Sequence, residues 1–123
     1  EHVLIKENHI TAAGSLTRAV ELTRRHAPHT AKIEVETESL EQVSEALEAG
    51  AEVIMLDNMS PAKIQEATDL IDRAAIVEIS GGVTLATIPD FALPGVDVIS
   101  VGALTHSAPA ADFSMILYPD TAR

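Results

Sequence analysis

Three charged residues, Lys6, Glu36 and Asp57, each come directly after a short run of aliphatic residues. Such runs are typical of buried parallel strands, and parallel strands end at one edge of a sheet, where ligands bind. The carboxylates of Glu36 and Asp57 would hold a hard cation such as Mg²⁺ there, or accept hydrogen bonds from sugar hydroxyls. The structural alternative is a Glu36 that faces water and an Asp57 that caps the loop after it.

Lys6 ends a very apolar run, so we expect its ammonium to be partly desolvated at that edge. There it would pair with an anionic substrate as a point charge or, once deprotonated, form a Schiff base. A lysine at a strand end also commonly lays its stem along apolar surface and keeps its ammonium in water. The residue by itself leaves these three roles open.

Two glycine-containing turns, Ser80-Gly81-Gly82 and Gly102-Ala103, follow later aliphatic runs, and His106 lies just beyond the second turn. Glycine lets backbone N–H groups approach an anion, and the start of a following helix adds the positive end of its dipole. Two neighbouring late loops often form the phosphate site of a barrel. The pattern therefore predicts a phosphate cradle with His106 as a donor. Two tight turns and an ordinary loop histidine are the alternative.

The strands that must position these residues are predicted from five aliphatic runs, at residues 3–5, 33–35, 53–56, 75–79 and 96–101. An alternating segment at 113–118 predicts a last edge strand.

Apolar residues recur at helical spacing in four segments between the strands, which begin near residues 16, 40, 61 and 84. Ser39 with Gln42 forms a capping box at the start of the second segment. Ser60 stands before a proline, which is typical of an N-cap followed by proline in the first turn. Leu70 is assigned to the buried face of this third helix, and Pro89 is expected to interrupt the fourth.

The order of these elements is β-α-β-α-β-α-β-α-β, and right-handed crossovers leave an open doubly wound sheet or an arc of a (βα) barrel. A full barrel needs about 200 residues or more, so 123 residues supply only part of one. We therefore expect an α/β fold, a partial (βα) barrel of about five parallel strands, in a single domain over residues 1–123. Because Glu1 begins in what reads as mid-strand, we expect a piece of a longer protein.

Composition excludes several classes of function. Eight basic and nineteen acidic side chains give a net charge of −11, which disfavours nucleic acid and anionic membranes as partners. The sequence has no cysteine, so it has no disulfide, thiolate metal site or cysteine nucleophile. No apolar run approaches the length of a membrane span, and no signal peptide opens the sequence. We expect an acidic cytoplasmic protein.

Taken together, these residues resemble the quinolinate phosphoribosyltransferase family, the carboxylating nicotinate-nucleotide pyrophosphorylases, and specifically the C-terminal portion of their barrel domain. The resemblance covers nearly the whole chain and is carried by four blocks in order. They are Leu4-Ile5-Lys6-Glu7-Asn8-His9-Ile10; Ile33-Glu34-Val35-Glu36; Ile54-Met55-Leu56-Asp57-Asn58 with Glu78-Ile79-Ser80-Gly81-Gly82; and Val101-Gly102-Ala103-Leu104-Thr105-His106-Ser107.

The resemblance implies transfer of phosphoribose from phosphoribosyl pyrophosphate to quinolinate, which gives nicotinate mononucleotide, pyrophosphate and CO₂ in de novo NAD biosynthesis, with Mg²⁺ required. It implies that Lys6 faces the anionic substrates and that Glu36 and Asp57 surround the ribose hydroxyls and the metal. The residues it implies at the 5′-phosphate are Ser80, Gly81, Gly82, Gly102, Ala103 and His106.

Members of this family are longer. The resemblance implies that an N-terminal domain and the first barrel strands, which carry the basic pocket for quinolinate, are missing here. A chain without them is expected to be inactive alone. The family also implies a homodimer or a higher homo-oligomer.

Three other functions remain open at this level. The first is the related pyrophosphorylase associated with molybdate transport, which shares much of the phosphoribose site. The second is a Schiff-base aldolase with Lys6 as its nucleophile. The third is a non-catalytic half-barrel that self-associates to cover its open sheet edges.

Overall fold

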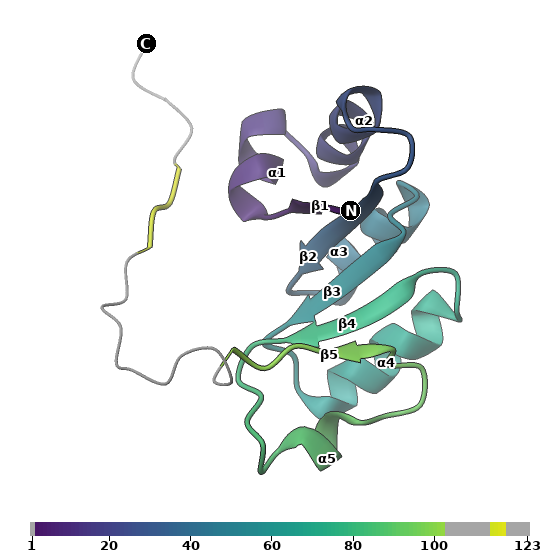
Figure 1. Cartoon of the computed structure of the whole chain (residues 1–123), viewed down its shortest axis with the longest axis vertical. Coiled ribbons are helices and arrows are strands. Elements are labelled where there is room, and N and C mark those ends of the chain that lie inside the picture. Colours follow the sequence, from purple (N-terminus) through teal and green to yellow (C-terminus); the bar gives the residue numbers. More distant parts are fainter. Residues whose placement is uncertain (1, 103–113, 118–123) are drawn as a thin grey trace.

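A computed structural model of the chain describes residues 2–102 and 114–117 (Figure 1). Its centre is a parallel sheet of five strands in sequence order. The strands are β1 (His2–Ile5), β2 (Lys32–Thr37), β3 (Val53–Asp57), β4 (Ile76–Ser80) and β5 (Val98–Ile99). The helices are α1 (Glu7–Ala13), α2 (Leu16–His26), α3 (Leu40–Glu48), α4 (Pro61–Ile71) and α5 (Ile88–Phe91). The predicted α/β fold with five parallel strands is confirmed, and the sheet is not closed.

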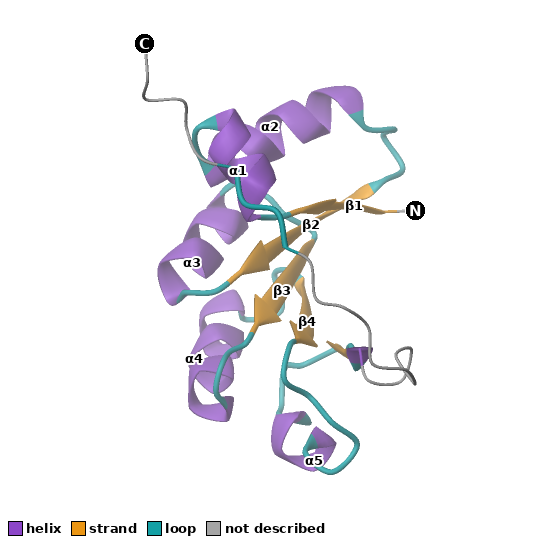
Figure 2. Ribbon diagram, turned by 90° about the vertical axis from the view of Figure 1, so that its left-hand side faces the viewer, coloured by secondary structure: helices purple, strands orange, loops and turns teal. Residues whose placement is uncertain are grey.

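The helices cover one face of the sheet, as Figure 2 shows. On β2, β3 and β4 the residues that point to this face are buried, for example Val35 on β2 and Ile54 and Leu56 on β3. Because side chains alternate along a strand, the residues between them point to the opposite face. That opposite face carries Glu34 and Glu36, whose register partners on β3 are Val53 and Met55. The charged residues therefore share the face that the helices leave open.

Local capping signals set where α2, α3 and α4 begin. The hydroxyl oxygens of Ser15, Ser39 and Ser60 each accept a hydrogen bond from the backbone N–H three residues later. The predicted capping role of Ser39 is confirmed. The Gln42 side chain closes this turn by accepting from the Glu38 N–H, 2.7 Å away, one residue before the cap.

Two helices differ from the prediction. The sequence reading missed α1, because its seven residues are too few to show a helical period and it follows β1 after a single residue. The segment predicted to be helical from residue 84 is helical only in α5, where Pro89 lies in the first turn and does not interrupt the helix.

Three further details of the prediction were wrong. Leu70 is 44% exposed, because the buried face of α4 includes Thr68 instead, together with Ile64, Ala67 and Ile71. The strand predicted at 96–101 is reduced to Val98–Ile99, although the Ser100 N–H still donates to the Ile79 carbonyl at 2.8 Å. Residues 114–117 of the predicted edge strand form no strand.

Residues 114–117 are instead held by the side chain of Asn8 on α1. Its Nδ2 donates to the Met115 carbonyl at 3.0 Å, and its Oδ1 accepts from the Leu117 N–H at 3.2 Å. In Figure 1 this segment lies well away from the sheet, so it adds no sixth strand. Within the described residues, none of the helices combines the length and the apolar character that crossing a bilayer requires.

Candidate functional site

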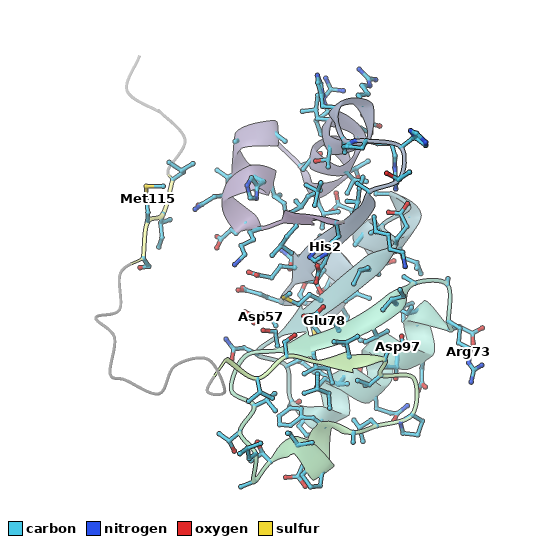
Figure 3. The ribbon with its side chains drawn as sticks, in the orientation of Figure 1. His2, Asp57, Arg73, Glu78, Asp97 and Met115 are labelled. Carbon is cyan, nitrogen blue, oxygen red and sulfur yellow. The ribbon has the colours of Figure 1, made fainter. Side chains whose placement is uncertain are left out.

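The carboxyl ends of β2 and β3 bring three carboxylates together. Glu36 lies near the end of β2, Glu38 follows that strand, and Asp57 is the last residue of β3. One carboxylate oxygen of each lies within 4.8 Å of the others. The sequence predicted Glu36 and Asp57 for this place and missed Glu38, whose position after the strand end was the only signal available. Asp57 is labelled in Figure 3 at this end of the sheet, opposite Arg73 and Asp97.

Lys6 extends from the end of β1 toward this cluster. Its Nζ lies 3.6 Å from Glu36 Oε2, and its side chain is 55% exposed whereas that of Glu36 is 19% exposed. The Lys6 backbone is fixed from both sides, because its N–H donates to His9 Nδ1 and its carbonyl accepts from the His9 N–H, both at 2.9 Å. The site therefore combines one accessible ammonium group with three carboxylates.

The turn after β4 lies directly beside Asp57, which is the register partner of Ser80. Gly81 and Gly82 both have positive φ, 80° and 69°, a conformation that glycine adopts without strain. Asn58 is also left-handed, with φ of 52°, and its N–H donates to the Ser80 carbonyl at 3.1 Å. Asn58 is a second residue that the sequence reading did not single out as part of the site.

The second glycine turn is described only in part. Gly102 follows β5, which pairs with β4, so it leaves the sheet beside the strand that ends at Ser80. Ala103 and His106 lie outside the described residues.

A polar chain crosses the open face one layer below the cluster. His2 Nε2 lies 3.0 Å from Glu34 Oε2, and Ser100 Oγ donates to Glu78 Oε1 at 2.5 Å. Glu34 is only 3% exposed, and its Oε1 has no hydrogen-bond partner among the described residues. Burial raises the pKa of Glu34, and repulsion from the charge of Glu78 raises it further, against a smaller opposing effect of His2.

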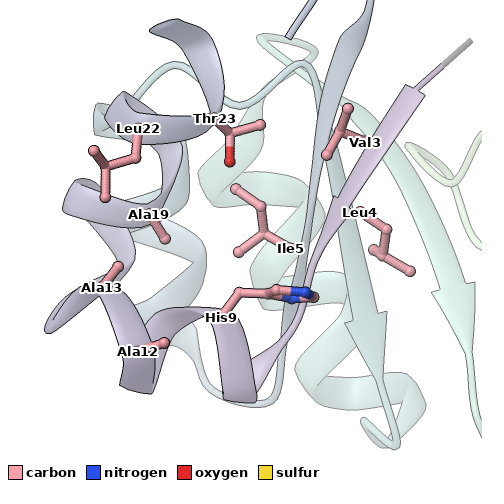
Figure 4. A pocket seen from close by; sticks show the side chains of 9 residues that line it. All are labelled: Val3, Leu4, Ile5, His9, Ala12, Ala13, Ala19, Leu22 and Thr23. Carbon is pink, nitrogen blue, oxygen red and sulfur yellow. The ribbon is translucent and has the colours of Figure 1, made fainter. Parts of the chain in front are cut away.

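Two pockets lie beside the carboxylate cluster or farther from it. Figure 4 shows a mainly apolar pocket of about 300 Å³ between β1, α1 and α2, which none of the predicted site residues lines. A second pocket, of about 400 Å³, lies on the open face and is lined by His2, Glu34 and Glu78 among others. At the carboxylate cluster, which we call the rim, Glu38 is exposed and Glu36 and Asp57 are partly buried.

The donor set of this rim fits magnesium. Mg²⁺ prefers carboxylate oxygens, usually one or two of them, together with water and substrate phosphates. Glu36, Glu38 and Asp57 offer such oxygens from two adjacent strand ends, and Lys6 borders them. The glycine turn next to Asp57 offers backbone N–H groups to an anion. The arrangement therefore suits a substrate that carries both phosphates and hydroxyls.

Comparison with known protein families agrees with the chemistry of this site. Residues 1–116 match the family model described as "Quinolinate phosphoribosyl transferase, C-terminal domain". The chain belongs to this family. The resemblance inferred from its four sequence blocks is confirmed, as is the assignment to the C-terminal portion.

Individual relatives agree with the family match. The chain is 43% identical over 119 residues to the human protein named "Nicotinate-nucleotide pyrophosphorylase [carboxylating]", and the match covers 94% of this chain and 40% of that protein. It is 45% identical over 113 residues to the Bacillus subtilis protein named "Probable nicotinate-nucleotide pyrophosphorylase [carboxylating]", covering 92% and 39%. The chain thus spans about 40% of the length of these relatives.

Solved structures also match. The crystal structure of NadC from Streptococcus pyogenes superposes with a TM-score of 0.82 at 43% identity, covering 94% of this chain and 41% of that one. A deletion mutant of NadC in a cubic crystal form gives the same TM-score, 0.82, and covers 93% and 40%. The likeness extends over nearly the whole chain, so the partial barrel assignment is confirmed at the level of the fold.

Proposed function

We propose that this chain forms the metal- and ribose-phosphate-binding part of an enzyme that transfers phosphoribose from phosphoribosyl pyrophosphate to quinolinate. The products are nicotinate mononucleotide, pyrophosphate and CO₂, in the de novo route to NAD. The observation that carries the proposal is the meeting of Glu36, Glu38 and Asp57 at one rim, bordered by Lys6, in a chain of this family.

The charges of the rim suit the chemistry of pyrophosphate departure. Loss of pyrophosphate leaves a ribosyl carbon with oxocarbenium character, and carboxylates near it stabilise the positive charge that develops there. In our proposal Glu36 and Asp57 bind the ribose hydroxyls and hold Mg²⁺, partly through substrate or water. When bound, Mg²⁺ would neutralise negative charge on the leaving pyrophosphate. Lys6 contributes a positive charge toward the anionic substrates.

The glycine turns would anchor the other end of the substrate. Backbone N–H groups at Ser80, Gly81 and Gly82 bind the 5′-phosphate in this proposal, assisted by Gly102, Ala103 and His106. Neutral amides hold a phosphate without adding net charge, so an acidic protein can bind it. This anchoring supplies binding energy that positions the ribosyl carbon against the rim.

The family match also supports a proposal for the setting of the enzyme. We propose a cytoplasmic homodimer or higher homo-oligomer whose partners are small-molecule substrates. The net charge of −11 supports the expectation that neither nucleic acid nor an anionic membrane is a partner.

The proposal is tested by calorimetric titration of the chain with phosphoribosyl pyrophosphate, with and without Mg²⁺, after circular dichroism has shown that the chain is folded. We expect binding that depends on Mg²⁺ and is lost in the double variant Glu36→Gln, Asp57→Asn. The control is Glu48→Gln, Asp69→Asn, which also removes two negative charges, but from exposed positions on α3 and α4. Binding that ignores Mg²⁺, or that survives in the first variant, would contradict the proposed role of the rim.

A further inference from the structure

Gly81 leaves space that two side chains of the neighbouring strand end occupy. A Cβ atom added to Gly81 would lie 2.7 Å from Asn58 Oδ1 and 2.8 Å from Asp57 Oδ1. Both distances are shorter than real Cβ contacts allow, so one partner would have to move. The missing side chain of Gly81 is therefore what lets Asp57 and Asn58 lie against the turn after β4.

The same contact is tightened by the backbone of Asn58. Its left-handed φ of 52° turns the chain directly after Asp57, and its N–H donates to the Ser80 carbonyl at 3.1 Å. The backbone of Asp57 is held in the sheet, because Asp57 is the last residue of β3 and pairs in register with Ser80 of β4. Its carboxylate thus extends from the end of the strand into the space that a side chain at residue 81 would occupy.

We propose that Gly81 is a positioning residue for Asp57: its bare backbone, together with Asn58, seats the Asp57 carboxylate so that it meets Glu36 and Glu38. This inference rests on the proposed function in one respect, because it takes the three carboxylates to be the metal site. It goes beyond that function by giving Gly81 an effect on the metal side of the site in addition to the phosphate side. A change in the glycine turn is then expected to alter metal binding at the carboxylate rim as well as phosphate binding.

Gly82 provides a matched control for this proposal. It is the next residue in the same turn and also has positive φ, so alanine there pays a similar backbone strain. A Cβ on Gly82, however, would come no closer than 3.6 Å to Asn58 Oδ1, which is an ordinary contact. Any difference between Gly81→Ala and Gly82→Ala therefore reports the contact with Asp57 and Asn58.

The test is a titration of the chain with Mn²⁺, in which the relaxation rate of water protons measures how much Mn²⁺ is bound. We expect Gly81→Ala to weaken Mn²⁺ binding by about tenfold, the usual effect of disturbing a residue that orients a metal ligand, and Gly82→Ala to leave it within about twofold. Equal effects of the two variants would overturn the proposal.

Two additions keep the outcome decisive. If Gly81→Ala does not fold, the double variant Gly81→Ala, Asn58→Gly removes the contact with the Asn58 side chain and keeps the 2.8 Å conflict with Asp57. Its Mn²⁺ binding should still be weaker than that of the unaltered chain. If the unaltered chain binds no Mn²⁺, the metal part of the proposed function fails. The positioning role is then decided by the ¹³C chemical shift of the Asp57 carboxyl, which should move in Gly81→Ala and stay in place in Gly82→Ala. An unmoved shift in both would overturn it.

Discussion

Glu34 shows how one side chain on the open face depends on its neighbours. Its side chain is 3% exposed and lies between His2 and Glu78, and the negative charge of Glu36 on the same face also acts on it. Burial and the nearby carboxylates raise its pKa above the ordinary value of 4.5. The folded protein therefore holds this proton more tightly than the unfolded chain does. The resulting stabilisation is complete at a pH below that ordinary value and is lost as the pH rises through the raised pKa.

We predict that Glu34→Gln removes this dependence, because the amide does not ionise. The free energy of unfolding of the variant should match that of the unaltered chain at pH 4 and exceed it by about 1 kcal/mol at pH 8. Urea unfolding at a series of pH values measures the difference. Glu66→Gln, at an exposed position on α4, is the control and should show no such trend. Parallel pH profiles for Glu34→Gln and the unaltered chain would contradict this explanation.

At the scale of elements, Glu52 joins α2 to the beginnings of β2 and β3. Its Oε2 accepts from the Ile33 N–H at 2.8 Å, and its Oε1 accepts from Arg24 at the end of α2, whose Nη2 also donates to the Gly50 carbonyl at 2.7 Å. Burial alone would raise the pKa of Glu52. The hydrogen bonds from Arg24 and Ile33 and the charge of Arg24 outweigh burial and lower it.

A lowered pKa gives the opposite sign from Glu34. The stabilisation from Glu52 is present at a pH above its ordinary value of 4.5 and is lost as the pH falls through the lowered pKa. We predict that Glu52→Gln reduces the free energy of unfolding by about 1 kcal/mol at pH 7, a modest amount because the pair is partly exposed. The deficit should disappear in acid. Thermal unfolding beside the exposed control Glu48→Gln decides this, and a deficit that persists unchanged at pH 2 would contradict it.

At the scale of the whole molecule, the chain spans about 40% of the length of its relatives, and the sheet formed by its described residues is not closed. Quinolinate carries two carboxylates, whereas the described site gathers three carboxylates beside Lys6. Like charges in close contact disfavour binding. Phosphoribosyl pyrophosphate is more anionic still, but in the proposed function Mg²⁺ would bridge its oxygens to the carboxylates, whereas quinolinate would depend on the single positive charge of Lys6 at this rim.

We predict that the chain alone releases no pyrophosphate from phosphoribosyl pyrophosphate in the presence of quinolinate and Mg²⁺, even where calorimetry shows binding. A coupled assay for pyrophosphate measures this, with the full-length human relative as the positive control. Turnover by the chain that is lost in Asp57→Asn would show that these residues are sufficient for the reaction.

The sequence by itself determined the elements and the edge at which they end. Aliphatic runs predicted the five strands, and serine caps predicted where α3 and α4 begin, because both signals lie within a few neighbouring residues. Since parallel strands end together, the same pattern also predicted one rim for Glu36, Asp57 and Ser80. Short elements escaped it, as α1 did, because seven residues carry too little periodicity.

Only the tertiary structure decided which side chains meet. Glu38 joins the carboxylate cluster, Glu34 approaches Glu78 across β3, and Asp57 and Asn58 lie against Gly81. Each contact joins residues from different strands or from the loops that follow them, so it depends on register, twist and the path of a turn. These quantities are set by how the whole sheet packs against its helices, and no local pattern around any one of these residues encodes them.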